Sequence, residues 1–260
     1  MYSLIHRTDA LFLCLILFVS MLGATVVGRL CNKKWGKDER DVSGGINSLL
    51  TALFALSGFL LAFTFGLSGN RLERVRSVIE QEGNSIGTAA LRADLYSDSV
   101  RQEFRTNFKL YLEAVISFYE NAADRSLLIK AKADAATAAQ RLWTIATQES
   151  KQPNMLIPSN QMIPALNTMF DSANSREIVL KSKVPDLILY MLFVCVLATC
   201  FIGGLTSDSF HYKEWIVIGG FALLSSLVVY TTLDLSRPMR GVIKERAGRD
   251  AIVDLRKMFE

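Results

Sequence analysis

The sequence has few of the residue patterns on which enzyme active sites depend. Its 260 residues include only two histidines, His6 and His211, and four cysteines that form no CxxC pair or other zinc-binding pattern. It also has no glycine-rich phosphate loop after a strand, no GxSxG turn and no HExxH pair. These absences argue against an enzyme, so we expect no catalytic residues, no metal site and no cofactor.

The periodicity of β-strands is missing as well, and four long runs lack charged residues. No stretch alternates apolar and polar residues with the period of two that is typical of β-strands. Four long runs contain no charged residue: Ala10–Gly28, Ile46–Ser68, Leu187–Ser207 and Trp215–Leu233. Each run can cross a hydrocarbon core of about 30 Å as a helix. The sequence therefore predicts an all-α protein with four transmembrane helices in a lipid bilayer.

The first run has two interpretations. Arg7 precedes its apolar core, as in a secretory signal peptide. However, the core is longer than a typical signal-peptide core, and no small-x-small cleavage site precedes the charges that follow. We therefore expect a retained membrane anchor.

The spans define the domain organisation. Residues 1–68 contain transmembrane helices one and two, 69–185 form a helical domain inserted between the second and third spans, 186–235 contain helices three and four, and 236–260 form a basic C-terminal helix. Basic residues are more numerous beside the inserted domain and the termini than beside the two short loops. The positive-inside rule therefore predicts that the domain and both termini are cytoplasmic. This topology explains the net charge of +4 without a nucleic-acid partner.

The inserted domain has its own helical patterns. Aromatic and aliphatic residues recur at helical spacing from Phe104 to Tyr119, which predicts a bundle core rather than a ligand-binding aromatic box. A helix over roughly 126–149 carries alanines that allow close approach of neighbouring helices: Ala131, Ala135, Ala138 and Ala139. Another helix runs from about Pro158 to Lys183. In the membrane part, Gly203-Gly204 and Gly219-Gly220 are expected to permit close helix contact.

The second run has no stop signal, and helical spacing continues past it to about Leu95. We expect one helix that leaves the membrane and extends well into the cytoplasm. At about 100° per residue, its membrane part has two different faces. One is a stripe of small, polar and aromatic residues, Asn47, Thr51, Phe54, Gly58, Ala62, Phe65 and Gly69. The other is a leucine face, Leu49, Leu53, Leu56, Leu60 and Leu67.

The stripe has two interpretations: close helix packing through small residues, or the lining of a water-filled path. It continues beyond the membrane through Arg76, Glu80, Gly83 and Gly87, so the same helix could line a vestibule. Arg76 suggests an anion and Glu80 a cation, and the sign of the ion stays open. No span carries a charge at mid-depth, which disfavours a coupled transporter and is compatible with passive conduction.

Three motifs carry a family resemblance. They are the stretch from Glu82 to Leu95 directly after the GFLLAFTFGLS span, Asn174-Ser-Arg176 ahead of Pro185, and Leu233 to Pro238 at the end of the last span. Together they resemble a bacterial membrane-protein family of unknown function that is described as bestrophin-like, with remote similarity to bestrophin ion channels. The resemblance implies the bacterial inner membrane and a homo-oligomer, a tetramer or pentamer, around a pore that the second span lines.

The resemblance also implies an apolar neck in that pore. On the stripe, Phe54 and Phe65 are the neck candidates, and Phe59 and Phe63 are rivals under another helix rotation. The acidic calcium clasp of bestrophins is absent, so calcium gating is not expected. Two hypotheses follow: an oligomeric channel for a small inorganic ion, which the resemblance favours, or a non-conducting adaptor or sensor whose cytoplasmic helices bind a partner.

Overall fold

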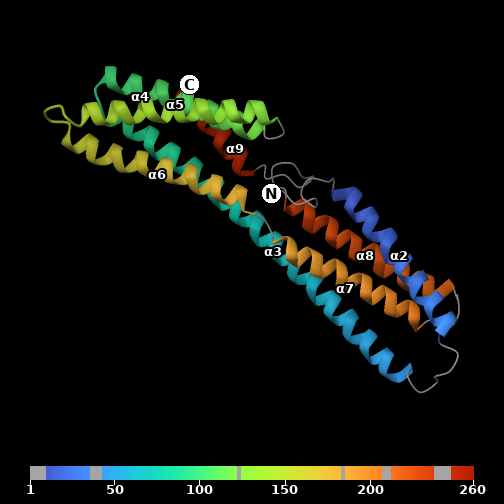
Figure 1. The fold of residues 1–260 in the computed structure, drawn as a ribbon. Helices are drawn as coiled ribbons and strands as arrows, with labels where there is room; N and C mark the ends of the chain where they lie inside the picture. Colours follow the sequence, from blue (N-terminus) through green and yellow to red (C-terminus); the bar gives the residue numbers. More distant parts are fainter. Residues whose placement is uncertain (1–9, 36–42, 122–123, 183–184, 207–211, 237–246) are drawn as a thin grey trace. The chain divides into compact units, whose positions relative to one another are not determined.

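The computed structural model describes residues 10–35, 43–121, 124–182, 185–206, 212–236 and 247–260. Within these ranges every regular element is an α-helix or a short 3₁₀-helix, so the all-α prediction is confirmed there (Figure 1). His6, His211, Arg237 and Pro238 lie outside the described residues. The chain divides into two compact units, one with residues 1–71 and 184–236 and the other with residues 72–183 and 237–260.

Helix α3 (Ser43–Leu91) belongs to both units and is 49 residues long. At 1.5 Å per residue its length is about 70 Å. It contains no proline, and it is unbroken at the Gly69-Asn70 pair. The prediction that the second apolar run continues as one long helix is confirmed. The 3₁₀ turn η1 (Arg92–Leu95) ends it, and Tyr96 is then in an extended conformation.

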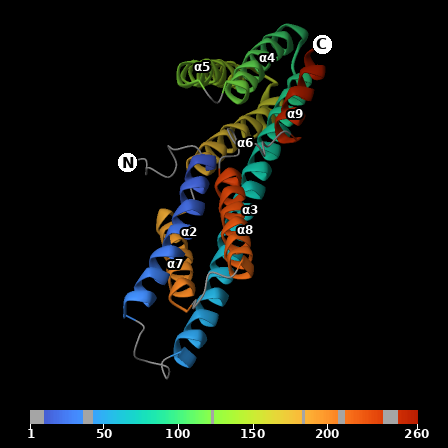
Figure 2. The same cartoon turned by 90° about the vertical axis from the view of Figure 1, so that its right-hand side faces the viewer.

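The first unit contains the membrane part of α3 together with α2 (Ala10–Trp35), α7 (Asp186–Leu205) and α8 (Tyr212–Leu235). Helix α2 packs against both α7 and α8 (Figures 1 and 2). Four stretches are long and apolar enough to cross a membrane: Ala10–Lys34, Ser48–Leu95, Leu156–Leu205 and Glu214–Leu235. They contain the apolar parts of the four predicted spans that the structure describes. The chain is an integral membrane protein by these criteria.

Glycines allow α2 and α7 to approach closely. A Cβ atom added to Gly28 would lie 2.0 Å from the Phe201 carbonyl oxygen, and one added to Gly204 would lie 2.1 Å from the Thr25 carbonyl oxygen. The prediction of a close contact is thus confirmed for Gly204, with α2 as its partner. At Gly219 and Gly220 an added Cβ meets no described atom within 4 Å, so the close contact expected there stays a prediction.

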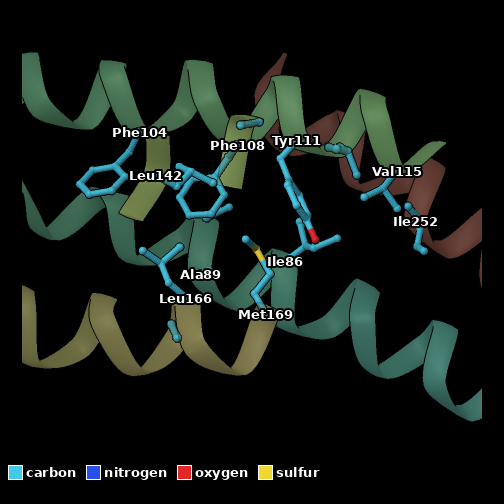
Figure 3. Packing of buried hydrophobic residues seen from close by; sticks show 14 of the residues in the cluster. Ile86, Ala89, Phe104, Phe108, Tyr111, Val115, Leu142, Leu166, Met169 and Ile252 are labelled. Atoms are coloured by element: carbon cyan, nitrogen blue, oxygen red, sulfur yellow. The ribbon is translucent and has the colours of Figure 1, made fainter. Parts of the chain in front are cut away.

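The second unit is a helical bundle around an aromatic and aliphatic core. It contains the later part of α3 with α4 (Asp98–Glu120), α5 (Arg125–Glu149) and α6 (Leu156–Lys181). Phe104, Phe108 and Tyr111 of α4 point into this core, together with Leu142 of α5 and Met169 of α6 (Figure 3). The prediction that the aromatic spacing of 104–119 marks a bundle core is confirmed. Burying each such side chain is worth about 1.5–3 kcal/mol.

The C-terminal helix α9 (Ala247–Asp254) and the 3₁₀ turn η2 (Leu255–Phe259) pack on α3 and α4. A Cβ added to Gly83 would lie 3.4 Å from Cγ1 of Ile252, and one added to Gly87 would lie 3.3 Å from Cδ2 of Leu255. The expectation that these two glycines face a vestibule is therefore wrong, because the end of the chain covers them. They provide space for the C-terminal segment instead.

Candidate functional site

The membrane part of α3 is the least covered of the four candidate spans. Only 11% of its most apolar window is buried, compared with 28%, 39% and 33% for the other three. Most of its surface therefore contacts none of the other described helices of the chain.

One narrow polar stripe of α3 is covered. Ser57, Thr64 and Ser68 are fully buried. The Ser57 hydroxyl lies 2.8 Å from Oγ1 of Thr199 on α7, and the Ser68 hydroxyl lies 3.2 Å from Oγ of Ser236 at the end of α8. Interhelical hydroxyl pairs of this kind stabilise helix contacts in an apolar medium by about 0.6–2 kcal/mol each. Sequence reasoning missed these residues, although their spacing of seven and four places them on one helix face.

Arg71 adds a further contact at the same end of the helix. Its guanidinium donates a hydrogen bond to the Ser236 carbonyl oxygen over 2.7 Å. That carbonyl follows the last turn of α8, where carbonyl groups lack helical partners and cationic side chains are favourable. The contact fixes α3 to α8 just beyond the apolar run.

The predicted stripe lies away from this covered face. Thr51, Gly58 and Ala62 are exposed, and Gly69 is half-buried. A Cβ added to Gly58 or Gly69 would meet no described atom within 4 Å. Asn47 lies on α3 at the start of the stripe. The structure therefore leaves Gly58 and Ala62 exposed, and the described residues cover Gly69 only partly.

The four phenylalanines differ in their contacts. Phe54 and Phe65 are 37% and 46% exposed, and Phe59 and Phe63 are 64% and 48% exposed. The Phe54 ring makes an edge-on contact with Phe221 of α8, at 4.8 Å between ring centroids. Phe59 and Phe63 stack on each other at 6.1 Å. All four phenylalanines of α3 keep exposed surface. Either Phe54 and Phe65 or Phe59 and Phe63 can therefore face a pore.

Arg76 and Glu80, the predicted vestibule residues, form an exposed ion pair. Nε of Arg76 lies 3.0 Å from Oε1 of Glu80, one helical turn further along α3. Because the pair combines one positive and one negative charge, it leaves the sign of the ion open.

A buried polar cluster joins α3, α4 and α6 in the second unit. Nη1 of Arg176 donates to both carboxylate oxygens of Glu82, at 2.7 and 2.9 Å, and the Tyr119 hydroxyl donates to Oε2 over 2.9 Å. The Arg176 guanidinium also lies over the Phe118 ring at 4.5 Å. Burial raises the pKa of Glu82, and the bonds from Arg176 and Tyr119 oppose this shift. Two of the sequence motifs contained Glu82 and Arg176, but their pairing was not predicted.

These observations define a class: an all-α integral membrane protein with four candidate spans and a helical bundle held by a buried ion pair. Within the described residues, no group of three or more His, Cys, Asp or Glu side chains is arranged to hold a metal ion.

Comparison with known proteins identifies the family within this class. The model of the Bestrophin-like domain family matches residues 14–244, and the chain belongs to this family. A crystal structure of a bacterial bestrophin homologue from Klebsiella pneumoniae with one substitution matches with a TM-score of 0.72 at 10% identity, over 97% of each chain. Another structure of a bacterial bestrophin homologue from the same organism gives 0.67 at 11%, over 96% of this chain and 97% of the other. No protein of curated function matches the chain.

Proposed function

We propose that this protein is an ion channel built from several copies of the chain, in which α3 lines the pore and its phenylalanines form an apolar gate. The observation that carries the proposal is the exposure of Gly58 and Ala62, together with the open space beside Gly58 and Gly69. These residues have the small size that a close neighbour or a water path requires, and the chain's own described helices do not use them.

A pore lined by α3 requires more than one copy of the chain, because one helix cannot enclose an axis. Closed rings of identical subunits are the common symmetric solution, and each subunit then contributes the same surface. The low coverage of α3 supports this arrangement, since Ser57, Thr64 and Ser68 are the fully buried residues among those described in its membrane part. A tetramer or pentamer in the bacterial inner membrane is the assembly that we propose.

The gate is assigned to phenylalanine side chains of α3. A ring of exposed aromatic groups makes a hydrophobic constriction that closes by dewetting. Phe54 and Phe65 are the first candidates, because they share the face of Gly58 and Ala62. Phe59 and Phe63 are the alternative, because they lie further around the helix from the buried Ser57.

The second unit and both termini are proposed to lie in the cytoplasm, as the distribution of basic residues indicates. Arg76 and Glu80 would then stand at the cytoplasmic mouth of the pore. The permeant species is proposed to be a small inorganic ion, and the internal neutralisation of this pair leaves its sign to experiment.

Recordings from purified protein in planar bilayers test the gate. Phe54→Ala or Phe65→Ala is expected to raise the open conductance severalfold, because a smaller side chain removes part of the dewetting barrier. Phe12→Ala is the matched control, because Phe12 is an exposed phenylalanine of α2. A rise only in Phe59→Ala and Phe63→Ala would move the gate to the alternative face.

The alternative function, a non-conducting adaptor or sensor, predicts silence from the wild type and from all four variants. Oligomeric state is the first measurement to make. A strict monomer both in detergent and in lipid would exclude a pore around a shared axis.

A further inference from the structure

An open surface cavity of about 500 Å³ lies on the second unit, lined by residues of α4, α5 and α6. Its volume falls in the range of about 300–1,000 Å³ that is typical of small-molecule sites. The residues that matter for its chemistry are Lys132, Gln140, Trp143, Asn167, Phe170 and Arg176. No part of the proposed conduction path uses this cavity.

Alanines of α5 create the space. Ala131 and Ala138 are buried in the bundle, as close helix approach predicts. Ala135 and Ala139 also pack against the core, as predicted, and in addition they line the cavity, where their small size leaves room.

One part of the lining is aromatic. The rings of Trp143 on α5 and Phe170 on α6 lie edge to face, with 6.3 Å between their centroids. Both side chains are half-buried and line the cavity. Such a pair offers flat apolar surface to a ring or a branched aliphatic group.

The charged part of the lining consists of Lys132, Arg176 and the carboxylate of Glu177. Arg176 is only 8% exposed, and its buried Nε has no hydrogen-bond partner among the described residues. Lys132 pairs with Glu177, and Lys181 pairs with the same carboxylate. Two lysines thus share one glutamate, while Glu82 balances Arg176. The lining itself holds two cations, Lys132 and Arg176, and one carboxylate, Glu177, and the Nε–H of Arg176 has no acceptor among the described residues.

We propose that this cavity binds a small organic carboxylate, with its apolar body against Trp143 and Phe170 and its carboxylate group toward Lys132 and Arg176. Gln140 and Asn167 supply amide donors and acceptors for the remaining polar groups. Charge-assisted hydrogen bonds to the two cations select an anion over a neutral molecule of the same shape.

The test uses the full-length protein in phosphatidylcholine nanodiscs and ¹⁹F NMR of two probes, 4-fluorobenzoate and 4-fluorobenzamide, with empty nanodiscs as the blank. The benzoate is expected to bind at least about tenfold more tightly than the amide, because only the benzoate carries a charge. Equal binding of the two probes, or no binding of the benzoate at about 10 mM, would overturn the proposal.

Two matched pairs of variants locate the site. Lys132→Gln is expected to weaken benzoate binding about fivefold or more, and Lys181→Gln by less than about twofold, because only Lys132 lines the cavity. Ala139→Leu fills the cavity and is expected to abolish binding, while Ala133→Leu on the exposed side of α5 leaves it unchanged. Benzoate affinity that is the same in Lys132→Gln and Lys181→Gln would contradict the proposal even if Ala139→Leu does not fold. Binding is measured without ion flow, so the result stands whether or not the protein conducts.

Discussion

The buried ion pair between Glu82 and Arg176 gives the sharpest test of how the second unit is held together. We predict that Arg176→Met strongly destabilises the protein. After the substitution, the fully buried Glu82 carboxylate keeps the hydrogen bond from the Tyr119 hydroxyl but has lost both bonds from Arg176. Removing one member of a buried pair costs about 3–5 kcal/mol, because the other charge stays desolvated without its counter-ion.

The size of the effect distinguishes this pair from the exposed pairs of the same protein. Arg76→Met is the matched control, because the Arg76–Glu80 pair lies on α3, is exposed and joins residues one turn apart. Such pairs contribute about 0.3–0.5 kcal/mol. For a chain of this size, 1 kcal/mol corresponds to about 2–4 °C in the melting temperature. Arg176→Met should therefore melt several degrees below Arg76→Met.

The assay is thermal unfolding of the purified protein in one detergent, followed for wild type, both single variants and Glu82→Leu combined with Arg176→Met. The double variant removes both charges, so it should recover most of the loss, since apolar replacements of buried pairs are often neutral. If Arg176→Met melted within about 1 °C of Arg76→Met, the pair would not hold α3, α4 and α6 together. If the double variant were no more stable than Arg176→Met, the unpaired charge would not be the cause of the loss.

Two further predictions concern other contacts. Gly204→Ala should destabilise the protein by about 1–3 kcal/mol in thermal unfolding, because its Cβ would collide with the α2 backbone. Gly219→Ala gains the same helix propensity without a collision and should not destabilise the protein. Equal loss of stability in both variants would contradict the α2–α7 contact. The hydrogen bonds from Arg256 lower the pKa of Glu113. A lowered carboxyl pKa stabilises the fold above the ordinary value of about 4.3 and ceases to do so as pH falls through the lowered value. Wild type should therefore melt above Glu113→Gln at pH 7, and the difference should shrink below pH 4; a difference that grows on acidification would refute this linkage.

The helices and spans were predictable because each depends on residues close together in the sequence. The four uncharged runs have the length of a membrane span, and the spacing from Phe104 to Tyr119 has the period of a helix with one buried face. The continuity of α3 was predictable for the same reason, since nothing in its sequence ends a helix at Gly69.

Contacts between distant segments were not predictable in this way. Glu82 and Arg176 are 94 positions apart, and nothing in either motif identifies its partner. Small residues were ambiguous for a similar reason, because an alanine or a glycine permits close contact without showing what fills the space. Gly83 contacts the C-terminal segment, Gly204 contacts α2, and Ala139 lines a cavity.

Cysteine accessibility on α3 tests the central claim most directly. The background has the four native cysteines, Cys14, Cys31, Cys195 and Cys200, replaced by alanine. Gly58→Cys and Leu56→Cys are then exposed to a charged, water-soluble methanethiosulfonate during recording in planar bilayers. The account predicts that the reagent blocks the current through Gly58→Cys and leaves Leu56→Cys unchanged. Block of Leu56→Cys without block of Gly58→Cys would show that the stripe of small residues does not face the ion path.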